Sequence, residues 1–372
     1  MATQRLTTSE SVMLDIVRAS AAGLVAFGHV TQHYFSTGIP DLTSYARGAV
    51  GVFFVLSGFV IRYVTTGRPT TFGHYFGDRA SRIYSIAVPA LLLTVLTDTV
   101  ALHVNPSFYH YWYIDYVHPW RRVIMNLAFC GHFWNYIRYP MSNNPYWSVD
   151  FEVTYYLIYG FWFYLTGIKR WIGVLAVGLI KGPEIMYLFP LWIAGCVIHD
   201  LYQKWVASPP WSRTRVSICA GCLSSVALAV FARFHVPAKT MHGFTHFIYS
   251  IHLRPTEYLF GVMWATIFFA LLLLARQISL QPRTRFVRTV TFLSEGTFPT
   301  YLLHFPIYVL IAACIPYDHA KLLPKVLMFL FVVTIGILAG HPGNIFKNKL
   351  RGLPETVRRY RAGKTPPVGT NA

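Results

Sequence analysis

Ionisable side chains inside long apolar stretches are the residues of this chain best suited to chemistry. Arg18 and His29 share the first such stretch, Glu152 lies in a middle one and His304 in a late one. A charged group at the bilayer centre costs at least about 2.5–3.5 kcal/mol on insertion scales, so each needs a partner or a function. An imidazole can act as general base or nucleophile, and a nearby carboxylate can hold its tautomer. His29 and Glu152 are therefore the candidate catalytic residues.

Three arginines form a candidate seat for an anionic ligand. Arg79 and Arg82 are i,i+3 neighbours directly after Asp78, a candidate N-cap, so we expect both at a helix N-terminus. Guanidiniums and helix N-termini both favour phosphate. Arg18 precedes His29 by eleven residues, which is about 16 Å of helix, roughly half the hydrocarbon thickness of a bilayer. Taken singly, such arginines are more often topogenic, and a lone membrane histidine is more often a packed side chain.

The elements that must position these residues are predicted to be membrane helices. Of the 372 residues, 54% are hydrophobic and only 12% are charged, too few charges to cover a soluble domain of this length. The sequence predicts an all-α polytopic bundle with about ten membrane helices. We place them near 13–35, 46–64, 79–104, 146–168, 171–182, 184–202, 216–234, 257–275, 290–314 and 325–343. The short segment 121–137 is expected to be re-entrant or to lie on the surface.

The distribution of basic residues predicts the orientation. The net charge of +18 alone would favour nucleic-acid binding, but the basic residues lie between apolar segments and not along one polar face. With both termini cytoplasmic, 22 of the 32 Lys and Arg residues lie on the inner side, as the positive-inside rule requires. We expect residues 1–345 to form the membrane domain and 346–372 a basic cytoplasmic tail. No cleavable signal peptide is expected, because the first apolar stretch carries Asp15 and Arg18.

The predicted outer loops, 105–145 and 235–256, are rich in aromatic and histidine residues. Interfacial aromatic belts explain most of this pattern, and a face that stacks on sugar rings is the functional alternative. His242 and His246 are spaced like metal ligands, but no carboxylate completes a site, so no metal is expected. Cys219 and Cys222 lie in an apolar stretch and are interpreted as packing residues.

Five segments in order resemble the membrane-bound acyltransferase family 3. They are the Arg18-to-His29 spacing, the string Gly51-Val52-Phe53-Phe54-Val55-Leu56-Ser57-Gly58-Phe59, Arg79 with Arg82, Trp147-Ser148 followed by Glu152 and Tyr155-Tyr156, and Tyr301-Leu302-Leu303-His304-Phe305-Pro306. Many members have a second acidic residue where this chain has Val153. The esterase-like outer domain of longer members is also missing from this sequence. We interpret Ser57 and Gly58 as helix-packing residues rather than as a nucleophilic site.

The resemblance implies transfer of an acyl group from cytoplasmic acyl-CoA to a hydroxyl of an exported polysaccharide or other surface glycan. Acetyl is the expected acyl group, and succinyl is the alternative. In this scheme Arg18, Arg79 and Arg82 bind the CoA phosphates. His29 is the base or acyl carrier, and Glu152 holds its imidazole. Trp147, Tyr301 and His304 are then expected to contact substrate.

The implied setting is the bacterial inner membrane. The expected partners are a glycan or glycoside acceptor, the lipid bilayer and proteins of polysaccharide biosynthesis or export, with no nucleic acid. A proton-coupled transporter is the alternative, because buried Arg, His and Glu also serve such proteins. No inverted repeat of the transporter kind is visible in the sequence.

Overall fold

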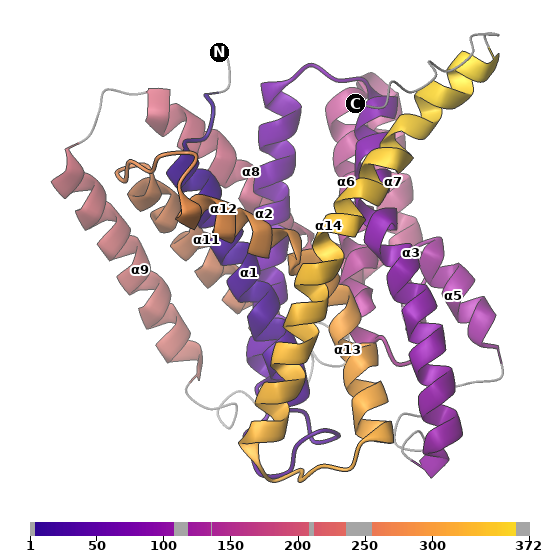
Figure 1. The fold of residues 1–372 in the computed structure, drawn as a ribbon. Helices are drawn as coiled ribbons and strands as arrows, with labels where there is room; N and C mark the ends of the chain where they lie inside the picture. Colours follow the sequence, from indigo (N-terminus) through magenta and orange to yellow (C-terminus); the bar gives the residue numbers. More distant parts are fainter. Residues whose placement is uncertain (1–3, 108–117, 135, 208–211, 236–254, 362–372) are drawn as a thin grey trace.

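The structure is a computed structural model that describes residues 4–107, 118–134, 136–207, 212–235 and 255–361. Long helices dominate this part of the chain (Figure 1). They are α1 (Thr8–Val30), α2 (Thr43–Gly67), α3 (Phe72–Val104), α5 (Pro119–Leu127), α6 (Trp147–Tyr164), α7 (Gly167–Lys181), α8 (Pro183–Ala207), α9 (Arg213–His235), α11 (Pro255–Ala275), α12 (Arg285–Glu295), α13 (Thr297–Cys314) and α14 (Leu322–Arg361). The remaining elements are the 3₁₀ turn η1 (Asn144–Tyr146) and the short antiparallel strands β1 (His132–Phe133) and β2 (Tyr136–Ile137).

Six helices in the described ranges are long and apolar enough to cross a membrane. They are α1, α2, α3, α8, α13 and the Leu322–Gly352 part of α14. The chain is therefore a polytopic α-helical membrane protein, as the sequence predicts. The total of about ten crossings and the cytoplasmic termini remain predictions. The start of α1 and the end of α14 lie at the same end of the bundle (Figure 1), and α14 continues past residue 345 without a break.

A capping box starts the first helix. The Thr7 side chain accepts from the backbone of Glu10, and the Glu10 carboxylate accepts from the backbone of Thr7. The Glu10 carboxylate is fully buried and also meets Tyr202 of α8 and Arg276, which follows α11. These contacts extend α1 by five residues before the predicted start at 13 and join three helices at this end of the bundle.

Helices α2 and α8 approach each other closely through a pair of glycines. A Cβ on Gly58 would overlap the backbone of Trp192, and a Cβ on Gly195 would overlap the backbone of Val55. Apolar side chains are no better solvated by another helix than by lipid, so membrane helices associate through close packing, which small residues such as glycine permit. The packing role expected for Gly58 agrees with this contact.

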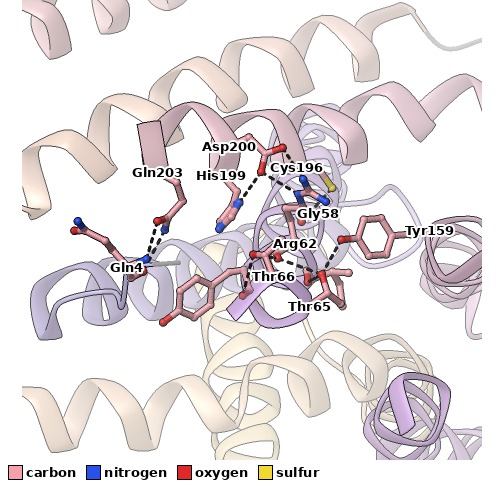
Figure 2. A network of polar contacts seen from close by, with 12 residues as sticks. Gln4, Gly58, Arg62, Thr65, Thr66, Tyr159, Cys196, His199, Asp200 and Gln203 are labelled. Atoms are coloured by element: carbon pink, nitrogen blue, oxygen red, sulfur yellow. Dashed lines mark hydrogen bonds and ion pairs between the residues drawn. The ribbon is translucent and has the colours of Figure 1, made fainter. Parts of the chain in front are cut away.

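Polar contacts continue this interface toward the end of α2 where the chain enters α3 (Figure 2). The Arg62 guanidinium donates to both carboxylate oxygens of Asp200 at 2.9 and 3.0 Å. Thr65 shares a hydrogen bond of 2.7 Å with the hydroxyl of Tyr159 on α6. Helix α2 is thus hydrogen-bonded to α8 on one side and to α6 on the other, and Ser57 of α2 lies between these two helices.

Helix α5 is too short to cross the membrane by itself. Helix α5 has nine residues, or about 14 Å at 1.5 Å per residue, against a hydrocarbon core of about 30 Å. The segment ends in the β1–β2 hairpin, where the backbone N–H of His132 donates to Asp150 at 2.8 Å. Lys181 donates to Asp150 at 2.5 Å and to the carbonyl of Phe129. The buried carboxylate of Asp150 therefore fastens this segment to α6 and α7.

The predicted helix 290–314 is wrong as a single element. The chain breaks at Gly296 into α12 and α13, and a Cβ at Gly296 would overlap the backbone of α14 at Ile337. Arg285 and Arg288 on α12 are exposed, beside exposed Phe286. This mixture of basic and apolar residues suits a helix that lies in the membrane surface, and α12 lies across the bundle (Figure 1).

Candidate active site

Five of the predicted site residues line one cavity of about 70 Å³ inside the bundle. Arg18, Arg79, Arg82 and Glu152 come from α1, α3 and α6, and Tyr301 of α13 closes the same cavity. Helix-borne side chains from these elements converge because α13 packs against both α1 and α3. The structure therefore brings the three arginines together with Glu152, as the sequence analysis expects.

A second cavity of about 140 Å³ adjoins the first. The two share Arg18, Arg82 and Phe298, and the second one extends to Asn344 and Lys347 of α14. Arg18 and Arg82 thus line both cavities, between the α14 side of the bundle and Glu152.

The expected position of Arg79 and Arg82 at a helix N-terminus is wrong. Helix α3 begins at Phe72 with Thr71 as its N-cap, so both arginines lie about two turns inside it. The helix dipole acts mainly within the first turn, so the guanidiniums alone supply the positive charge here. Asp78 is not a cap either, since Arg351 of α14 pairs with both its oxygens at 2.5 Å. The Nε of Arg79 is buried and has no hydrogen-bond partner among the described residues.

Glu152 bonds to residues other than His29. Ser57 Oγ donates to its carboxylate at 2.9 Å, and the hydroxyl of Tyr156 donates to the same oxygen. Ser57 in turn accepts from the indole N–H of Trp192 at 3.2 Å. Glu152 therefore does not contact His29 as expected. It belongs instead to a hydrogen-bonded cluster with Ser57, Tyr156 and Trp192.

His29 pairs instead with His304. The His29 Nδ1 and His304 Nε2 atoms are 2.9 Å apart, and the two rings stack with centroids 5.0 Å apart. His304 is fully buried, and its Nδ1 lies 2.7 Å from the carbonyl oxygen of Tyr301. His29 keeps part of its surface accessible. Complete burial does not fit the expected contact of His304 with substrate.

These contacts assign the tautomers of the neutral pair. The carbonyl of Tyr301 can only accept, so Nδ1 of His304 carries the proton and its Nε2 is an acceptor. Nδ1 of His29 must then donate to that Nε2. Nε2 of His29 keeps its lone pair, and this is the atom able to take a proton or an acyl group.

Tyr301 separates the cavity from the histidine pair. Its ring lies 6.1 Å from that of His304, and its hydroxyl shares a hydrogen bond of 2.5 Å with Ser148. Trp147 packs on Phe151 with ring centroids 4.8 Å apart, and Ser148 rather than Trp147 lines the cavity. Tyr301 thus lines the cavity, and its contact with substrate stays a prediction, whereas Trp147 packs behind the cavity wall.

A larger basin of about 550 Å³ opens beyond the C-terminal end of α1. Gln32 and His33, three and four residues after His29, are part of its lining. The histidine pair consequently lies between the arginine cavity and this basin, which we call the outer basin. Its lining is Gln32, His33, Tyr34, Asp41, Thr43, Arg47, Arg122, Ile137, Arg138, Tyr139, Met141, Ser142 and Asn144.

Sequence reasoning missed three members of the site. Tyr156 follows Glu152 by four residues, so helical spacing could have found it. Ser57 was interpreted as a packing residue, although its hydroxyl bonds to the carboxylate of Glu152. Trp192 carries no sequence signal. His242 and His246 and the aromatic run 109–113 lie outside the described residues, and no group of three metal-ligating side chains occurs within them.

Comparison with known proteins agrees with this geometry. A family model described as an acyltransferase domain matches residues 12–341, nearly the whole chain. No curated protein and no solved structure matches. The match includes α1 through most of α14, and so includes every cavity residue described above except Lys347 and Asn344. The chain therefore belongs to acyltransferase family 3 and is a multi-pass membrane acyltransferase.

Proposed function

We propose that this protein transfers a short acyl group, acetyl in the first place, from cytoplasmic acyl-CoA to a hydroxyl of an exported polysaccharide or other surface glycan. One observation carries the proposal. The His29–His304 pair lies along α1 between a cavity lined by three arginines and a basin beyond the C-terminal end of that helix. A donor from one side and an acceptor from the other can meet at such a pair. We place the protein in the bacterial inner membrane, with the arginine cavity toward the cytoplasm.

The arginine cavity supports an anionic donor. Phosphate groups accept bidentate hydrogen bonds from guanidinium, and Arg79 has a buried N–H without a partner among the described residues. Arg18 and Arg82 also line the route toward α14, where the nucleotide end of the donor would bind.

The histidine pair supports general-base transfer. Nε2 of His29 takes the proton of the acceptor hydroxyl while the hydroxyl oxygen attacks the thioester carbonyl carbon. The C–S bond then breaks, the new C–O ester bond remains on the glycan, and the CoA thiolate leaves with the proton that His29 returns. His304 holds the ring of His29 and its tautomer, a role first expected of Glu152. Glu152, with Ser57 and Tyr156, lies on the wall where the arginines bind the donor and offsets part of their charge.

The test uses the full-length protein in membranes supplied with [¹⁴C]acetyl-CoA and the glycan fraction of the same cells. We expect base-labile label on glycan, reduced about 10²–10⁴-fold by His29→Ala while the variant still inserts, because general-base catalysis contributes that much. Equal labelling by His29→Ala would remove His29 from the mechanism. Uptake of glycan precursor into vesicles without any acyl transfer would favour the transporter instead.

A further inference from the structure

We propose that Asn143 is a positioning residue of the histidine pair: its side-chain amide holds the turn of α13 that orients His304. The inference rests on the proposed function, because it adds a residue to the machinery of the same His29–His304 pair. It goes further, since Asn143 lines none of the three cavities described above and would act without touching substrate.

Pro306 leaves one carbonyl of α13 without its helical partner. In an α-helix the carbonyl of residue i accepts from the N–H of residue i+4, and proline has no N–H. The carbonyl of Leu302 therefore receives no hydrogen bond from position 306. A buried carbonyl without a donor is costly, and it is most costly inside a membrane protein, where little water can replace the donor.

Asn143 supplies the missing donor. Its Nδ2 donates to the carbonyl of Leu302 at 3.0 Å and to Oγ1 of Thr94 on α3 at 3.1 Å. The Thr94 hydroxyl donates its own proton to the carbonyl of Ala90 at 2.7 Å, so it can only accept from Asn143. Both neighbours of Nδ2 are acceptors, and this fixes the orientation of the amide. Each N–H of the Asn143 amide thus has its own acceptor.

The turn that Asn143 holds is also the turn that orients His304. Leu302 follows Tyr301 directly, and the carbonyl oxygen of Tyr301 lies 2.7 Å from Nδ1 of His304. Two consecutive carbonyls of this turn are therefore bound by two side chains, one by Asn143 and the next one along by His304. Helices open at a proline unless another group replaces the lost bond. Without Asn143, the turn can open and His304 loses the acceptor that fixes its tautomer.

The chain on both sides of Asn143 is held in place, so the amide is a firm support. The Asp98 carboxylate of α3 accepts from the backbone N–H of Ser142 at 2.9 Å and from its hydroxyl at 2.6 Å. On the other side, the carbonyl of Pro145 accepts from the hydroxyl of Tyr301 at 3.2 Å. Asn143 thus lies between one attachment to α3 and one to α13.

The oxygen of the same amide argues for a role beyond stability. Asn143 is fully buried, and its Oδ1 has no hydrogen-bond partner among the described residues. A buried acceptor without a donor destabilises the folded state, and an apolar side chain at this position would avoid that cost. Such a group needs a reason in a native structure. The support that the two N–H groups give to the turn of His304 is that reason.

The tautomer of His304 tests the inference without any substrate. The full-length protein is labelled with [¹⁵N]histidine and reconstituted in lipid bilayers, and its ring nitrogens are observed by solid-state NMR, with His304→Gln and His29→Gln used for assignment. We expect His304 to be protonated only at Nδ1 in the parent, and a mixture with the Nε2-protonated form in Asn143→Ala. A pure Nδ1-protonated form in Asn143→Ala, or its absence from the parent, would overturn the inference.

Asn126→Ala is the matched control. Asn126 of α5 is also buried, and its Nδ2 donates to the backbone carbonyls of Arg122 and Arg138, each at 2.9 Å. Its loss should lower the melting temperature of the detergent-solubilised protein, as the loss of Asn143 should, but leave the His304 signals unchanged, since both acceptors belong to the α5 segment. Equal changes of the His304 signals in the two variants would show that Asn143 is merely structural.

Kinetics in two backgrounds test the link through Pro306. Asn143→Ala should lower kcat about threefold to tenfold, the contribution of one neutral hydrogen bond, with the KM for acetyl-CoA unchanged. In Pro306→Ala the backbone N–H at position 306 can serve the Leu302 carbonyl, so adding Asn143→Ala should cost less than about twofold more. Equal losses in both backgrounds would contradict the inference. Where Pro306→Ala has too little activity to measure, NMR decides, because the double variant should keep the Nδ1-protonated form.

The inference and the proposed function can fail separately. If His29→Ala transfers acyl groups normally, the proposed function fails, while the NMR spectra still decide whether Asn143 orients His304. If the spectra show no effect of Asn143 on His304, the positioning role fails and acyl transfer through His29 is untouched.

Discussion

At the scale of single residues, the donor site follows from spacing, whereas the histidine pair follows only from the fold. Arg79 and Arg82 share a face because they are three residues apart, and Arg18 lies one helix away. His29 and His304 are 275 residues apart, so no local pattern relates them. The cost of burying a polar group identifies each histidine as unusual, but it does not identify its partner. For this reason the sequence analysis predicts Glu152, and not His304, as the residue that holds the imidazole of His29.

His304 acts as a positioning residue, and its substitution should lower kcat with little change in KM. His304→Ala removes the acceptor of the His29 Nδ1 proton, so the ring of His29 loses its fixed tautomer and orientation. We expect a fall in kcat of about 10-fold to 100-fold, less than for His29→Ala. His304→Gln, whose amide oxygen can accept the same proton, should recover part of kcat. A rise in KM for either substrate at normal kcat would show direct substrate contact instead.

The arginines of the inner cavity should control donor affinity. Hydrogen bonds to charged groups contribute about 1.5–3 kcal/mol, so Arg79→Gln or Arg82→Gln should raise the KM for acetyl-CoA by roughly tenfold to a hundredfold. Arg68→Gln is the control, since Arg68 follows α2, is exposed and lines neither inner cavity. Normal kinetics of both cavity variants with acetyl-CoA would remove the donor-site assignment.

At the scale of elements, hydropathy locates long helices well and their interruptions poorly. It places α1, α2, α8, α9 and α11 within five residues of their observed ends, whereas α3 begins seven residues before its predicted start and α14 ends 18 residues after its predicted end. It misses the break at Gly296, because a sliding window averages α12 with the apolar α13 that follows. The break depends on the backbone of α14 at Ile337, a contact that hydropathy does not contain.

The close contact between α2 and α8 at Gly58 should leave no room even for a methyl group. Gly58→Ala places a Cβ into the backbone of Trp192, and overpacking of this kind costs about 1–3 kcal/mol. We expect a lower melting temperature of the detergent-solubilised protein, together with reduced activity because Ser57 shifts. Gly221→Ala on α9 is the matched control, since no atom lies within 4 Å of the added methyl. Equal melting of the two variants would show that α2 and α8 are not in close contact.

At the scale of the whole molecule, the arrangement predicts which substrate approaches from which side. The outer basin lies beyond the C-terminal end of α1, whereas the cavity toward α14 meets α1 at its middle, at Arg18. The sequence predicts the polarity of this arrangement from the excess of Lys and Arg on one side. It does not predict the basin, because residues 32–47 and 122–144 meet only when the segment that contains α5 and the β1–β2 hairpin is attached to α6 and α7.

The orientation can be measured with single cysteines in a cysteine-free background. Asn144→Cys lies in the outer basin and Lys349→Cys near the end of α14, and both positions are exposed. A membrane-impermeant maleimide added to intact spheroplasts should label Cys at 144 and spare Cys at 349 until the membrane is permeabilised. The reverse pattern would invert the topology and with it the assignment of donor and acceptor sides.

The hydrogen bond from His304 to the Tyr301 carbonyl also affects whether protons can leak across the membrane through this site. A site that joins both faces of a bilayer risks becoming a proton wire that discharges the electrochemical gradient. Here the two imidazoles end at a backbone carbonyl, a group that binds no proton at physiological pH. In the proposed reaction, a proton taken up at Nε2 of His29 must therefore leave through the same atom, so this pair would carry no proton across the bilayer.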